Sequence, residues 1–364
     1  MNILDKLKKQ KEALFSFCTK NKYIVLYGAE VMGEKFLKYL ERNNLNVTAF
    51  TISDGYKKAD SVYGKTVYNI SDLPYSKGET GIIVTLNSKF YTEINNILTN
   101  LGYSQIYFIS DLDLVNESER INPELFNNID IDFNSEVLDL KSFKISNPYF
   151  HSDYATIAFY TEAQDLVLPS LGKTVYIEGP YEYGNVILEE GDTVFDCGAN
   201  IGLFSSYCAS KKCMVHAFEP TPETIEFLKK NINLYPQNIM LAPYALSNKT
   251  EIIKFYTQDQ FYNNSIFEPK FSQSSIDVEA ITIDQYVEEN HIERVDFIKA
   301  DIEGAERLML QGAKNTLAKY APKLSICTYH HPDDKEVLEK IILDANPNYR
   351  IVHRWLKLFA YVPQ

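Results

Sequence analysis

Several features that mark specialised classes of protein are missing from the sequence. Its 364 residues include five cysteines but no Cys-x-x-Cys pair, and no histidine pair matches Cys208 and Cys213, so the spacing of a structural zinc site is absent. An odd number of cysteines without such pairs is typical of a reducing compartment, and we expect a cytoplasmic protein. No stretch approaches the ~20 apolar residues that span a bilayer, and the lysine-bearing N-terminus has no apolar core of a secretory signal. We therefore expect no integral membrane segment.

Basic residues are also scarce. Lysine and arginine number 36 against 49 aspartate and glutamate residues, which gives a formal net charge of −13. Proteins that bind nucleic acids present a basic face to the phosphates, so this balance argues against a nucleic-acid partner. Tryptophan occurs once, whereas tyrosine occurs 26 times and phenylalanine 21 times. Such rings either border grooves for polar ligands such as sugars or reflect a general drift in composition, and the sequence leaves both interpretations open.

The length predicts two domains, each able to bury a core. We expect a Rossmann-like domain at 1–115, a linker and cap segment at 116–183, and a second α/β domain at 184–364. The middle segment is polar and acidic, with a helix expected near Pro123–Asn127. It ends in an aromatic stretch whose residues either border a substrate pocket or pack the domain: His151, Tyr176, Tyr181 and Tyr183.

The first hundred residues alternate strands and helices around a glycine turn. Tyr23–Tyr27 has the pattern of a buried strand, Gly28 and Gly33 open an amphipathic helix, and Asp54 follows the next strand. This order is typical of a small Rossmann-like domain. Glu30 stands where the dinucleotide fingerprint has its second glycine, and its negative charge would oppose a pyrophosphate. A nucleotide-binding-like role and a docking role both stay open for this domain.

The second domain also alternates strands and helices, which predicts a doubly wound parallel sheet covered on both faces. The last two strands should form an antiparallel pair. The expected strands are Thr193–Cys197, Met214–Phe218, Ile239–Leu246, Val295–Ala300, Lys323–Tyr329, Arg350–Arg354 and Lys357–Val362. The expected helices are Leu203–Ala209, Pro222–Leu234, Asp284–Glu289 with Asp284 as its cap, Gly304–Lys319 and Asp334–Leu343. Two further extended segments, Glu251–Tyr256 and Val278–Ile283, flank a long loop that is a candidate lid.

The ends of the parallel strands carry the candidate site, because ligands of such sheets bind there. The first strand contains Asp196 and leads into a turn with Gly198 and Gly202, and glycines let a backbone approach a ligand closely. Glu219 follows the next strand, where an acid can accept both hydroxyls of a ribose. No Gly-Lys-Ser/Thr follows the turn, so a P-loop phosphate site is unsupported. The pattern favours a nucleoside-type cofactor with few phosphates, and S-adenosylmethionine fits it.

Four motifs in order carry a family resemblance: FDCGANIGLFS (Phe195–Ser205), AFEPTPET (Ala217–Thr224), FIKADIEGAE (Phe297–Glu306) and YHHPDD (Tyr329–Asp334). Together they resemble the FkbM-type S-adenosylmethionine-dependent methyltransferases. The resemblance implies a class I methyltransferase fold and O-methylation of a hydroxyl on a sugar, glycan or related metabolite. It implies cofactor-binding roles for Asp196, Gly198, Asn200, Gly202 and Glu219. The segment Tyr244–Asn248 would flank the adenine, and since it contains no acid, Ser247, Asn248 or the backbone would meet the adenine amino group.

Methylation of an alcohol requires a base or a metal ion to remove the proton. The candidate catalytic residues at the strand ends are His330, His331, Asp301 and Glu303. Each also has a structural alternative, because the histidines can serve a turn or a helix cap and the acids can orient Lys299. Two carboxylates and an imidazole could also hold a divalent metal ion, which the sequence leaves open.

The leading hypothesis is a cytoplasmic O-methyltransferase that acts on a small-molecule or glycan hydroxyl. One alternative is a non-catalytic S-adenosylmethionine- or nucleotide-binding protein. Another is an NAD-linked sugar-modifying enzyme that uses the Gly28–Gly33 turn, which Glu30 disfavours. The sequence names neither the acceptor nor its regiochemistry, and it leaves a homo-oligomer open.

Overall fold

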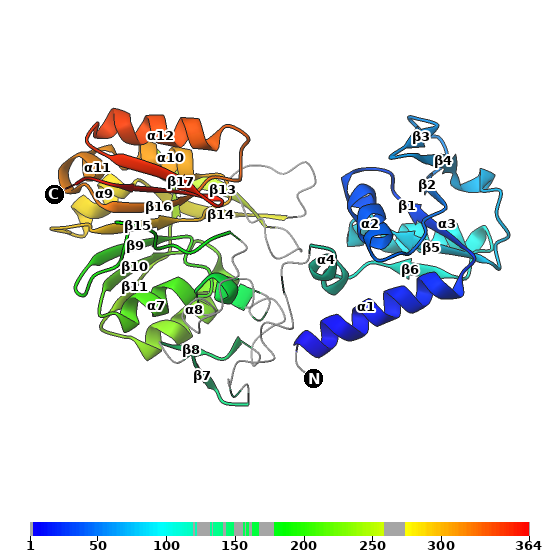
Figure 1. Ribbon diagram of the computed structural model, residues 1–364, viewed down its shortest axis with the longest axis horizontal. Helices are drawn as coiled ribbons and strands as arrows, with labels where there is room; N and C mark the ends of the chain where they lie inside the picture. The colour runs from blue at the N-terminus through cyan, green and yellow to red at the C-terminus, as the bar shows by residue number, and fades with distance from the viewer. Residues whose placement is uncertain are drawn as a thin grey trace. The chain divides into compact units, whose positions relative to one another are not determined.

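Two units make up the chain, Met1–Pro123 and Glu124–Gln364 (Figure 1). The computed structural model describes residues 3–118, 121, 132, 134–140, 143–148, 156, 158–159, 162–166, 178–257 and 274–363. The expectations for Pro123–Asn127, His151 and Tyr176, and for nearly all of the candidate lid, lie outside these residues.

The first unit is built on a six-stranded sheet that is parallel except at one edge. In order across the sheet, the strands are β3 (Ser61–Val62), β4 (Lys65–Asn69), β2 (Ala49–Ile52), β1 (Tyr23–Tyr27), β5 (Thr80–Val84) and β6 (Ile106–Phe108). Only the β3–β4 pair is antiparallel among these described strands. The helices are α1 (Ile3–Lys20), α2 (Val31–Arg42), α3 (Tyr91–Asn100) and α4 (Asp111–Ser118), with short 3-10 helices at Ile70–Asp72 and Ser88–Phe90. The predicted Rossmann-like organisation is confirmed.

The glycine turn after β1 is determined by close packing. Gly28 has a φ of +113°, which residues with a Cβ atom rarely adopt. A Cβ atom on Gly33 would lie 2.1 Å from the Gly28 carbonyl oxygen, so only glycine lets α2 start this close to the turn. Glu30, the N-cap residue of α2, has a side chain that is 72% exposed and lies 3.7 Å from the Lys58 ammonium. Both glycines therefore have a structural role that is independent of any nucleotide.

The second unit is built on a seven-stranded sheet, and its predicted architecture is confirmed. In order, the strands are β11 (Ile239–Ala242), β10 (Met214–Phe218), β9 (Thr193–Cys197), β15 (Phe297–Ala300), β16 (Lys323–Cys327), β18 (Lys357–Tyr361) and β17 (Arg350–Arg354). The first five are parallel to one another. β18 runs antiparallel to both β16 and β17, as predicted for the closing pair.

Helices cover both faces of this sheet (Figure 1). On one side lie α7 (Leu203–Ser210) and α8 (Pro222–Leu234), and on the other α9 (Ile283–Glu289), α10 (Glu306–Gln311), α11 (Lys314–Tyr320) and α12 (Asp334–Ala345). A core of fully buried side chains joins the sheet to the second layer: Phe195, Ile298, Met309, Leu324 and Leu338. Because both faces are covered, polar ligands can reach the sheet only at the strand ends.

The strand predicted at Ile239–Leu246 is two strands in two sheets. β11 belongs to the large sheet, whereas β12 (Ala245–Leu246) pairs in parallel with β14 (Ser274–Ile281) in a three-stranded sheet. β13 (Glu251–Thr257) completes this small sheet by pairing antiparallel with β14, so the two predicted extended segments pair with each other. Pro243 lies at the break, and proline cannot donate a hydrogen bond to a sheet.

The helix predicted at Gly304–Lys319 is also divided, into α10 and α11. The break falls at Gly312, where a Cβ atom would lie 2.3 Å from the carbonyl oxygen of Ser247. The chain segment after β12 therefore passes so close to the end of α10 that no side chain fits between them. The hydrophobic spacing carries no sign of this contact, because the two segments are far apart in sequence.

The prediction that Asp284 caps its own helix is wrong. The N-cap of α9 is Thr282, whose hydroxyl accepts a hydrogen bond from the Gln285 N–H at 3.0 Å. The Asp284 carboxylate instead accepts the N–H groups of Asn315 and Thr316, at 2.9 and 2.8 Å, and so caps α11. A short polar side chain before a helix can cap either its own helix or a neighbouring one, and packing decides which.

Part of the segment predicted as a linker is a β-hairpin of the second unit. β7 (Val137–Asp139) pairs antiparallel with β8 (Lys144–Ser146). The N–H of Ser146 donates to Asn231 Oδ1 at 2.7 Å, and a second amide of β8 donates to the Tyr235 hydroxyl at 2.8 Å. These bonds attach the hairpin to α8 and its C-terminal end. Strands of three residues are too short to show a clear alternation in the sequence.

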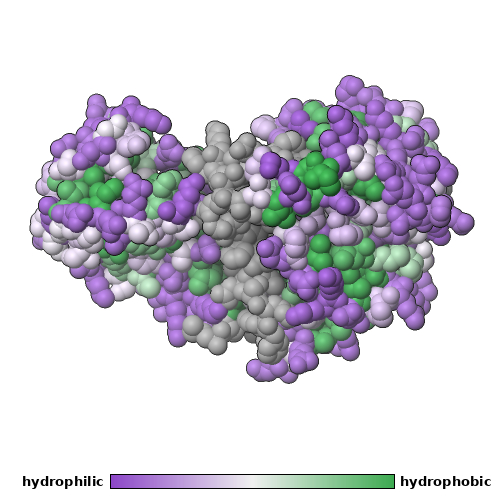
Figure 2. All heavy atoms as spheres, turned by 180° about the vertical axis from the view of Figure 1, so that it is seen from behind, coloured by the Kyte–Doolittle hydropathy of each residue, from purple (hydrophilic) through white to green (hydrophobic). Residues whose placement is uncertain are grey.

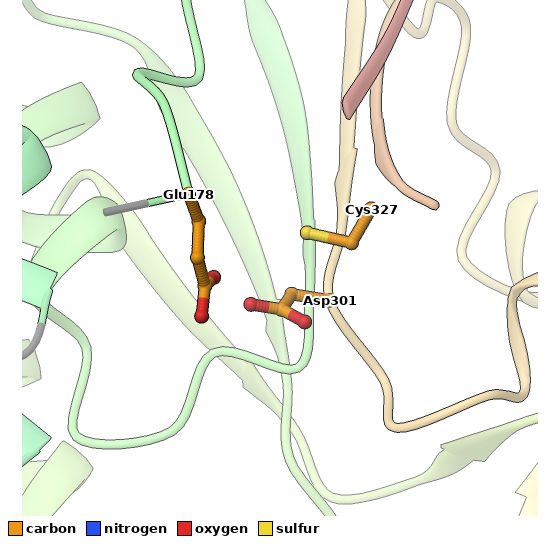
Figure 3. A group of neighbouring side chains, drawn as sticks. All are labelled: Glu178, Asp301 and Cys327. Atoms are coloured by element: carbon orange, nitrogen blue, oxygen red, sulfur yellow. The ribbon is translucent and has the colours of Figure 1, made fainter. Parts of the chain in front are cut away.

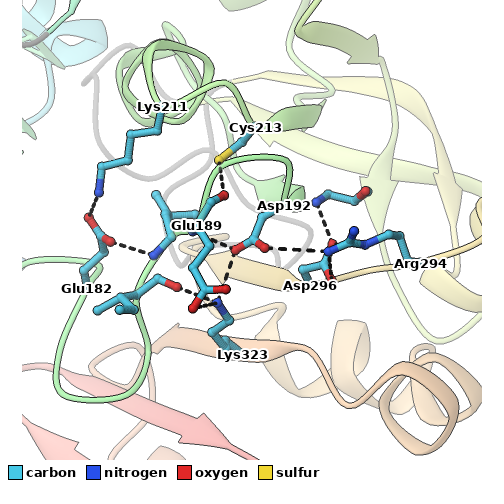
Figure 4. Close-up of polar contacts among 11 residues, drawn as sticks. Glu182, Glu189, Asp192, Lys211, Cys213, Arg294, Asp296 and Lys323 are labelled. Carbon is cyan, nitrogen blue, oxygen red and sulfur yellow. Dashed lines mark hydrogen bonds and ion pairs between the residues drawn. The ribbon is translucent and has the colours of Figure 1, made fainter.

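A polar network joins the amino ends of three central strands (Figure 4). The carboxylate of Asp296, just before β15, accepts the N–H of Thr193 at 2.7 Å and lies 2.7 Å from the Arg294 guanidinium. Asp192, just before β9, lies 3.2 Å from the ammonium of Lys323, the first residue of β16. These contacts hold β9, β15 and β16 together at the edge of the sheet opposite to their carboxyl ends.

No helix among the described residues is both long enough and apolar enough to cross a membrane. The face drawn in Figure 2 is mostly hydrophilic, with smaller hydrophobic areas on both units. Exposed apolar side chains include Ile252 and Met240, which are 63% and 40% exposed. More than half of a typical folded surface comes from apolar atoms, so such areas do not by themselves indicate a docking site.

Gly33→Ala should destabilise the first unit by about 1–3 kcal/mol, because the new methyl group overlaps the Gly28 carbonyl oxygen. The measurement is hydrogen exchange of the first unit's strand amides in the full chain. The matched control is Gly78→Ala, since a Cβ atom at Gly78 meets nothing within 4 Å and should change stability by less than about 0.5 kcal/mol. Equal protection in the two variants would contradict the close packing of this turn.

Asp296→Ala should lower the free energy of unfolding of the second unit by about 2 kcal/mol, because the Thr193 N–H and the Arg294 guanidinium lose their acceptor. Chemical denaturation measures this loss. As a control, Asp344→Ala removes an exposed ion pair with Lys340 and should cost less than about 1 kcal/mol. Losses of equal size would mean that the network contributes no more than a surface pair.

Candidate active site

One cavity opens at the edge where the parallel strands of the large sheet end. It encloses about 130 Å³, and its wall comes from the residues after β9, β10 and β15 together with β12. This is the edge at which open α/β sheets bind their ligands. The charged and amide side chains in the wall are Glu162, Asn200, Glu219, Lys299, Asp301 and Glu303.

A buried ion pair lies at the base of the cavity. Lys299 of β15 and Asp196 of β9 are 3% and 0% exposed, and the ammonium nitrogen lies 3.0 Å from Asp196 Oδ1. The ammonium also donates to the Gly198 carbonyl at 2.7 Å, and the Ser205 hydroxyl donates to Asp196 Oδ2 at 2.6 Å. Burial by itself lowers the pKa of Lys299, but nearby carboxylates, Asp196 foremost, outweigh burial and raise it. Asp196 therefore supports the glycine turn through Lys299 and is not part of the cavity wall.

The turn after β9 needs glycine at both predicted positions. Gly198 has a φ of +79°, and a Cβ atom there would lie 2.1 Å from the Asp301 carbonyl oxygen. Gly202 has a φ of +86°, and a Cβ atom there would lie 2.5 Å from Leu228 Cδ1. Asn200 between them adopts a φ of +50°. Gly198 and Asn200 line the cavity, whereas Gly202 is the N-cap of α7 and lies outside the wall.

Glu219 follows β10 and presents a buried carboxylate to the cavity. Its two oxygens accept backbone N–H groups, Oε2 from Asn200 at 3.1 Å and Oε1 from Thr221 at 2.9 Å. Burial raises the pKa of Glu219 in spite of these hydrogen bonds. Since a carboxylate oxygen has two lone pairs, each oxygen retains one for a ligand. This arrangement suits a pair of neighbouring hydroxyl groups.

The predicted adenine-flanking segment lines the cavity only in part. Tyr244–Leu246 contributes an apolar section of the wall. The chain then turns away, because the Ser247 N–H donates to the Ile281 carbonyl at 3.1 Å and the Asn248 amide donates to Gln311 at 3.0 Å. Neither Ser247 nor Asn248 lines the cavity. An adenine ring in this section would meet apolar side chains and backbone groups.

Asp301 follows β15 and is held by hydrogen-bond donors. Its carboxylate accepts the hydroxyls of Tyr329 at 3.0 Å and Tyr181 at 3.2 Å. Figure 3 shows the Glu178 carboxylate pointing toward that of Asp301. Burial by itself raises the pKa of Asp301, but the surrounding positive charges, Lys299 foremost, outweigh it and lower the pKa. Asp301 therefore stays ionised and has little affinity for a proton.

Carboxylates surround the imidazole of His330. Its Nδ1 lies 3.2 Å from Glu306 Oε1, and its Nε2 lies 3.5 Å from Glu303 Oε2 and 3.8 Å from Asp301 Oδ1. Burial lowers the pKa of the imidazole, but hydrogen bonding to Glu303 and Glu306 outweighs burial and raises the pKa to about 11. The ring is thus an imidazolium at neutral pH and has no lone pair with which to accept a proton.

Of the four predicted catalytic residues, the two carboxylates line the cavity and the two histidines do not. His331 lies at the start of α12, where its N–H donates to Asp334 at 2.7 Å and its Nε2 is 3.3 Å from the Gly304 carbonyl oxygen. Glu303 sits in the wall with a φ of +54°, and burial raises the pKa of its carboxyl group. The sequence places all four at the strand ends but cannot tell which side chains face the cavity.

Two sets of three described side chains have potential metal-ligand atoms within 4.8 Å of one another. The first is Asp301, Glu306 and His330, and the second is Glu178, Asp301 and Cys327 (Figure 3). In the first set, the His330 imidazole carries a proton on each nitrogen at neutral pH. In the second, burial raises the pKa of the Cys327 thiol well above its ordinary value, and a thiol must ionise to bind a metal. In both sets, a divalent ion would have to displace a proton from a ligand in order to bind.

For four residues the sequence left two roles open, bordering a pocket or packing the domain. The structure describes two of them, Tyr181 and Tyr183, and both pack within the domain. Tyr181 is 6% exposed and lies beneath the Lys357 ammonium, which is 4.5 Å from its ring centroid. Tyr183 packs against Trp355 with the ring centroids 5.3 Å apart. Neither tyrosine lines the cavity.

Sequence reasoning missed one acid of the wall, Glu162. It lies in helical residues 162–166, and its Oε1 is 3.4 Å from the Asn200 side-chain amide nitrogen. Burial raises the pKa of Glu162 to about 8. No strand end or glycine turn stands near it in the sequence, so the pattern that finds the other wall residues gives no signal here.

His330→Gln should lower the free energy of unfolding by roughly 3 kcal/mol near neutral pH, because removal of one partner leaves buried carboxylates uncompensated. The pKa of His330 is raised from 6.5 to about 11 in the folded state. Its stabilising contribution is therefore fully present below pH 6.5 and disappears as the pH rises through about 11. Chemical denaturation of wild type and variant across this range should show the difference shrinking as the pH rises.

The matched control for this experiment is His353→Gln, which removes a partly exposed pair with Glu339 at 2.9 Å. It should cost less than about 1 kcal/mol. A difference between wild type and His330→Gln that does not vary with pH would mean that His330 is not an imidazolium.

Comparisons with known proteins match the part of the chain that holds the cavity. Residues 196–361 match the family model of the methyltransferase FkbM domain. The hexuronic acid methyltransferase AglP of Haloferax volcanii is 29% identical over 157 residues, which cover 43% of this chain and 64% of that protein. The chain thus spans slightly less than two thirds of the length of this relative.

Two further relatives have the same kind of match. The 31-O-demethyl-FK506 methyltransferase FkbM of Streptomyces tacrolimicus is 23% identical over 52% of this chain and 85% of that protein. The 2-O-methyltransferase NoeI of Sinorhizobium fredii is 26% identical over 46% of this chain and 76% of that protein.

A crystal structure of methyltransferase FkbM from Methylobacillus flagellatus aligns with 99% of both chains at 17% identity and a TM-score of 0.41.

The matched range begins at Asp196 in β9 and ends at the last residue of β18, so it contains the strand ends that form most of the cavity wall. Residues 196–361 of the chain form a methyltransferase FkbM domain.

Proposed function

We propose that the protein is an S-adenosylmethionine-dependent O-methyltransferase that acts on a hydroxyl of a sugar, glycan or related small molecule. The observation that carries this proposal is the Glu219 carboxylate, which is buried in the cavity wall and fixed by two backbone N–H groups. The match of residues 196–361 to the methyltransferase FkbM domain supports the reaction class. The relatives named for hexuronic acid and 2-O-methyl transfer support a sugar-type acceptor.

The wall residues fit the parts of S-adenosylmethionine. Glu219 would accept the two ribose hydroxyls, and Tyr244–Leu246 would pack against the adenine. The Gly198–Asn200 turn would offer backbone groups to the amino-acid part. When bound, this cosubstrate supplies a methyl group on a positively charged sulfur, and the acidic wall complements that charge.

The chain's own contribution to the reaction would be positioning and proton removal. An enzyme gains much of its rate from holding the acceptor oxygen in line with the methyl group. Asp301, ionised and held by two tyrosine hydroxyls, would orient the acceptor. His330 would keep Glu303 in place through its positive charge. His331 would support the turn before α12.

Glu219→Gln should weaken S-adenosylmethionine binding by roughly 10- to 100-fold, because a charged acceptor of two hydroxyls becomes a neutral one. Isothermal titration calorimetry on the full chain measures this change. The matched control is Glu223→Gln, an exposed acid in the first turn of α8, which should bind as the wild type does. Equal affinity of Glu219→Gln and wild type would contradict the proposed cofactor position.

The reaction itself is tested by transfer of labelled methyl groups to a panel of hexuronic acids, neutral sugars and glycans. Transfer to a sugar hydroxyl is the expected result. Tight S-adenosylmethionine binding without transfer to any hydroxyl acceptor would favour a non-catalytic binding protein instead.

A further inference from the structure

We infer that the Glu162 carboxylate accepts the proton of the acceptor hydroxyl during methyl transfer, an inference that rests on the proposed function. Glu162 shares the cavity wall with Asn200 of the glycine turn and with Asp301 and Glu303 after β15. A hydroxyl that approaches a methyl group between the turn and the end of β15 would meet this side chain. No motif of the family resemblance includes it.

Among the described residues, the Glu162 carboxylate makes only one long polar contact. Its hydrogen bond from the Asn200 amide is 3.4 Å long, beyond the usual range for N–H···O bonds. Within the described part of the chain, no lysine, arginine or histidine nitrogen lies within 4.0 Å of it. A half-buried carboxylate without a close cation has lone pairs available for a ligand proton.

The other acids at this end of the cavity have fixed partners. Asp301 accepts two tyrosine hydroxyls, and Glu303 lies 3.5 Å from the His330 imidazolium. Glu219 accepts two backbone N–H groups on the other side of the cavity. These carboxylates are each held by donors or by a cation, whereas among the described residues Glu162 has only the long contact with Asn200.

The proton affinity of Glu162 is suited to this task. Burial is the largest influence and raises its pKa to about 8. Of the charges that face it, Lys299 lowers the pKa, whereas Asp196, Asp301 and Glu178 raise it. A general base works best when its pKa lies near the operating pH.

The step balances in atoms and charge. The acceptor O–H bond breaks, its proton moves to Glu162, and the oxygen electron pair forms a bond to the methyl carbon. The carbon–sulfur bond breaks and its electron pair stays on sulfur, so the sulfonium becomes a neutral thioether. The carboxylate becomes a neutral carboxylic acid, which later returns its proton to water.

Glu162→Gln keeps the size of the side chain but removes its ability to accept the proton. We expect kcat to fall at least about 100-fold. The affinity for S-adenosylmethionine, measured by calorimetry, and the KM for the acceptor should stay within about threefold. In the wild type, kcat should rise with pH through about 8, and this rise should be absent in the variant.

Two further variants complete the test. Glu162→Asp retains a carboxylate and should recover part of the lost rate, and its cofactor binding shows that the fold is intact. The matched control is Glu190→Gln, an exposed acid that pairs with Lys212 and does not line the cavity, which should keep the wild-type rate.

Three outcomes would overturn the inference. Loss of S-adenosylmethionine affinity in Glu162→Gln with kcat retained at saturation would make Glu162 a cofactor contact. Disappearance of the pH-dependent rise in Glu303→Gln, but not in Glu162→Gln, would assign the base to Glu303. Absence of both cofactor binding and methyl transfer in the wild type would contradict the proposed function itself and this inference with it.

Discussion

The cavity depends on one buried ammonium group. Lys299 reaches from β15 to β9, where it pairs with Asp196 and donates to the Gly198 carbonyl. The two strands are paired neighbours in the sheet, and at their ends there is no room for a Cβ atom on Gly198 beside the Asp301 carbonyl oxygen. Removing the ammonium would leave Asp196 as a buried charge without its counterion, which is strongly unfavourable. Strand pairing brings the glycine turn and the acids after β15 together, and this buried ion pair neutralises the charge beneath them.

The positions of most wall residues could be predicted from sequence because one physical rule decides them. Parallel strands covered by helices on both faces end at a common edge, so the residues that follow each strand converge. Glu219, Asp301 and Glu303 satisfy this rule and line the cavity. The rule predicts where a residue lies along its strand but not the direction of its side chain. It therefore also selected His331 and Asn248, which form hydrogen bonds outside the cavity wall.

The features that the sequence did not predict arise from contacts between distant segments. Glu162 enters the wall from a segment well before β9, without a motif of its own. The charge state of His330 depends on the carboxylates of Glu303 and Glu306, and the residues next to His330 in the sequence give no sign of them. The break at Gly312 reflects the approach of the Ser247 carbonyl. In each case the deciding partner is brought close only by the completed fold.

An acidic wall attracts a cationic cosubstrate, yet it also opposes the reaction. Glu219, Asp301 and Glu303 line the cavity together with Lys299, so the wall would stabilise a bound sulfonium before transfer. Methyl transfer removes that positive charge, and the transition state therefore gains less from the wall than the bound cosubstrate does. If Glu162 takes up a proton as the sulfonium loses its charge, a negative and a positive charge disappear together. The net charge of the buried site then stays constant during the step, which favours a base within the wall over a base in the solvent.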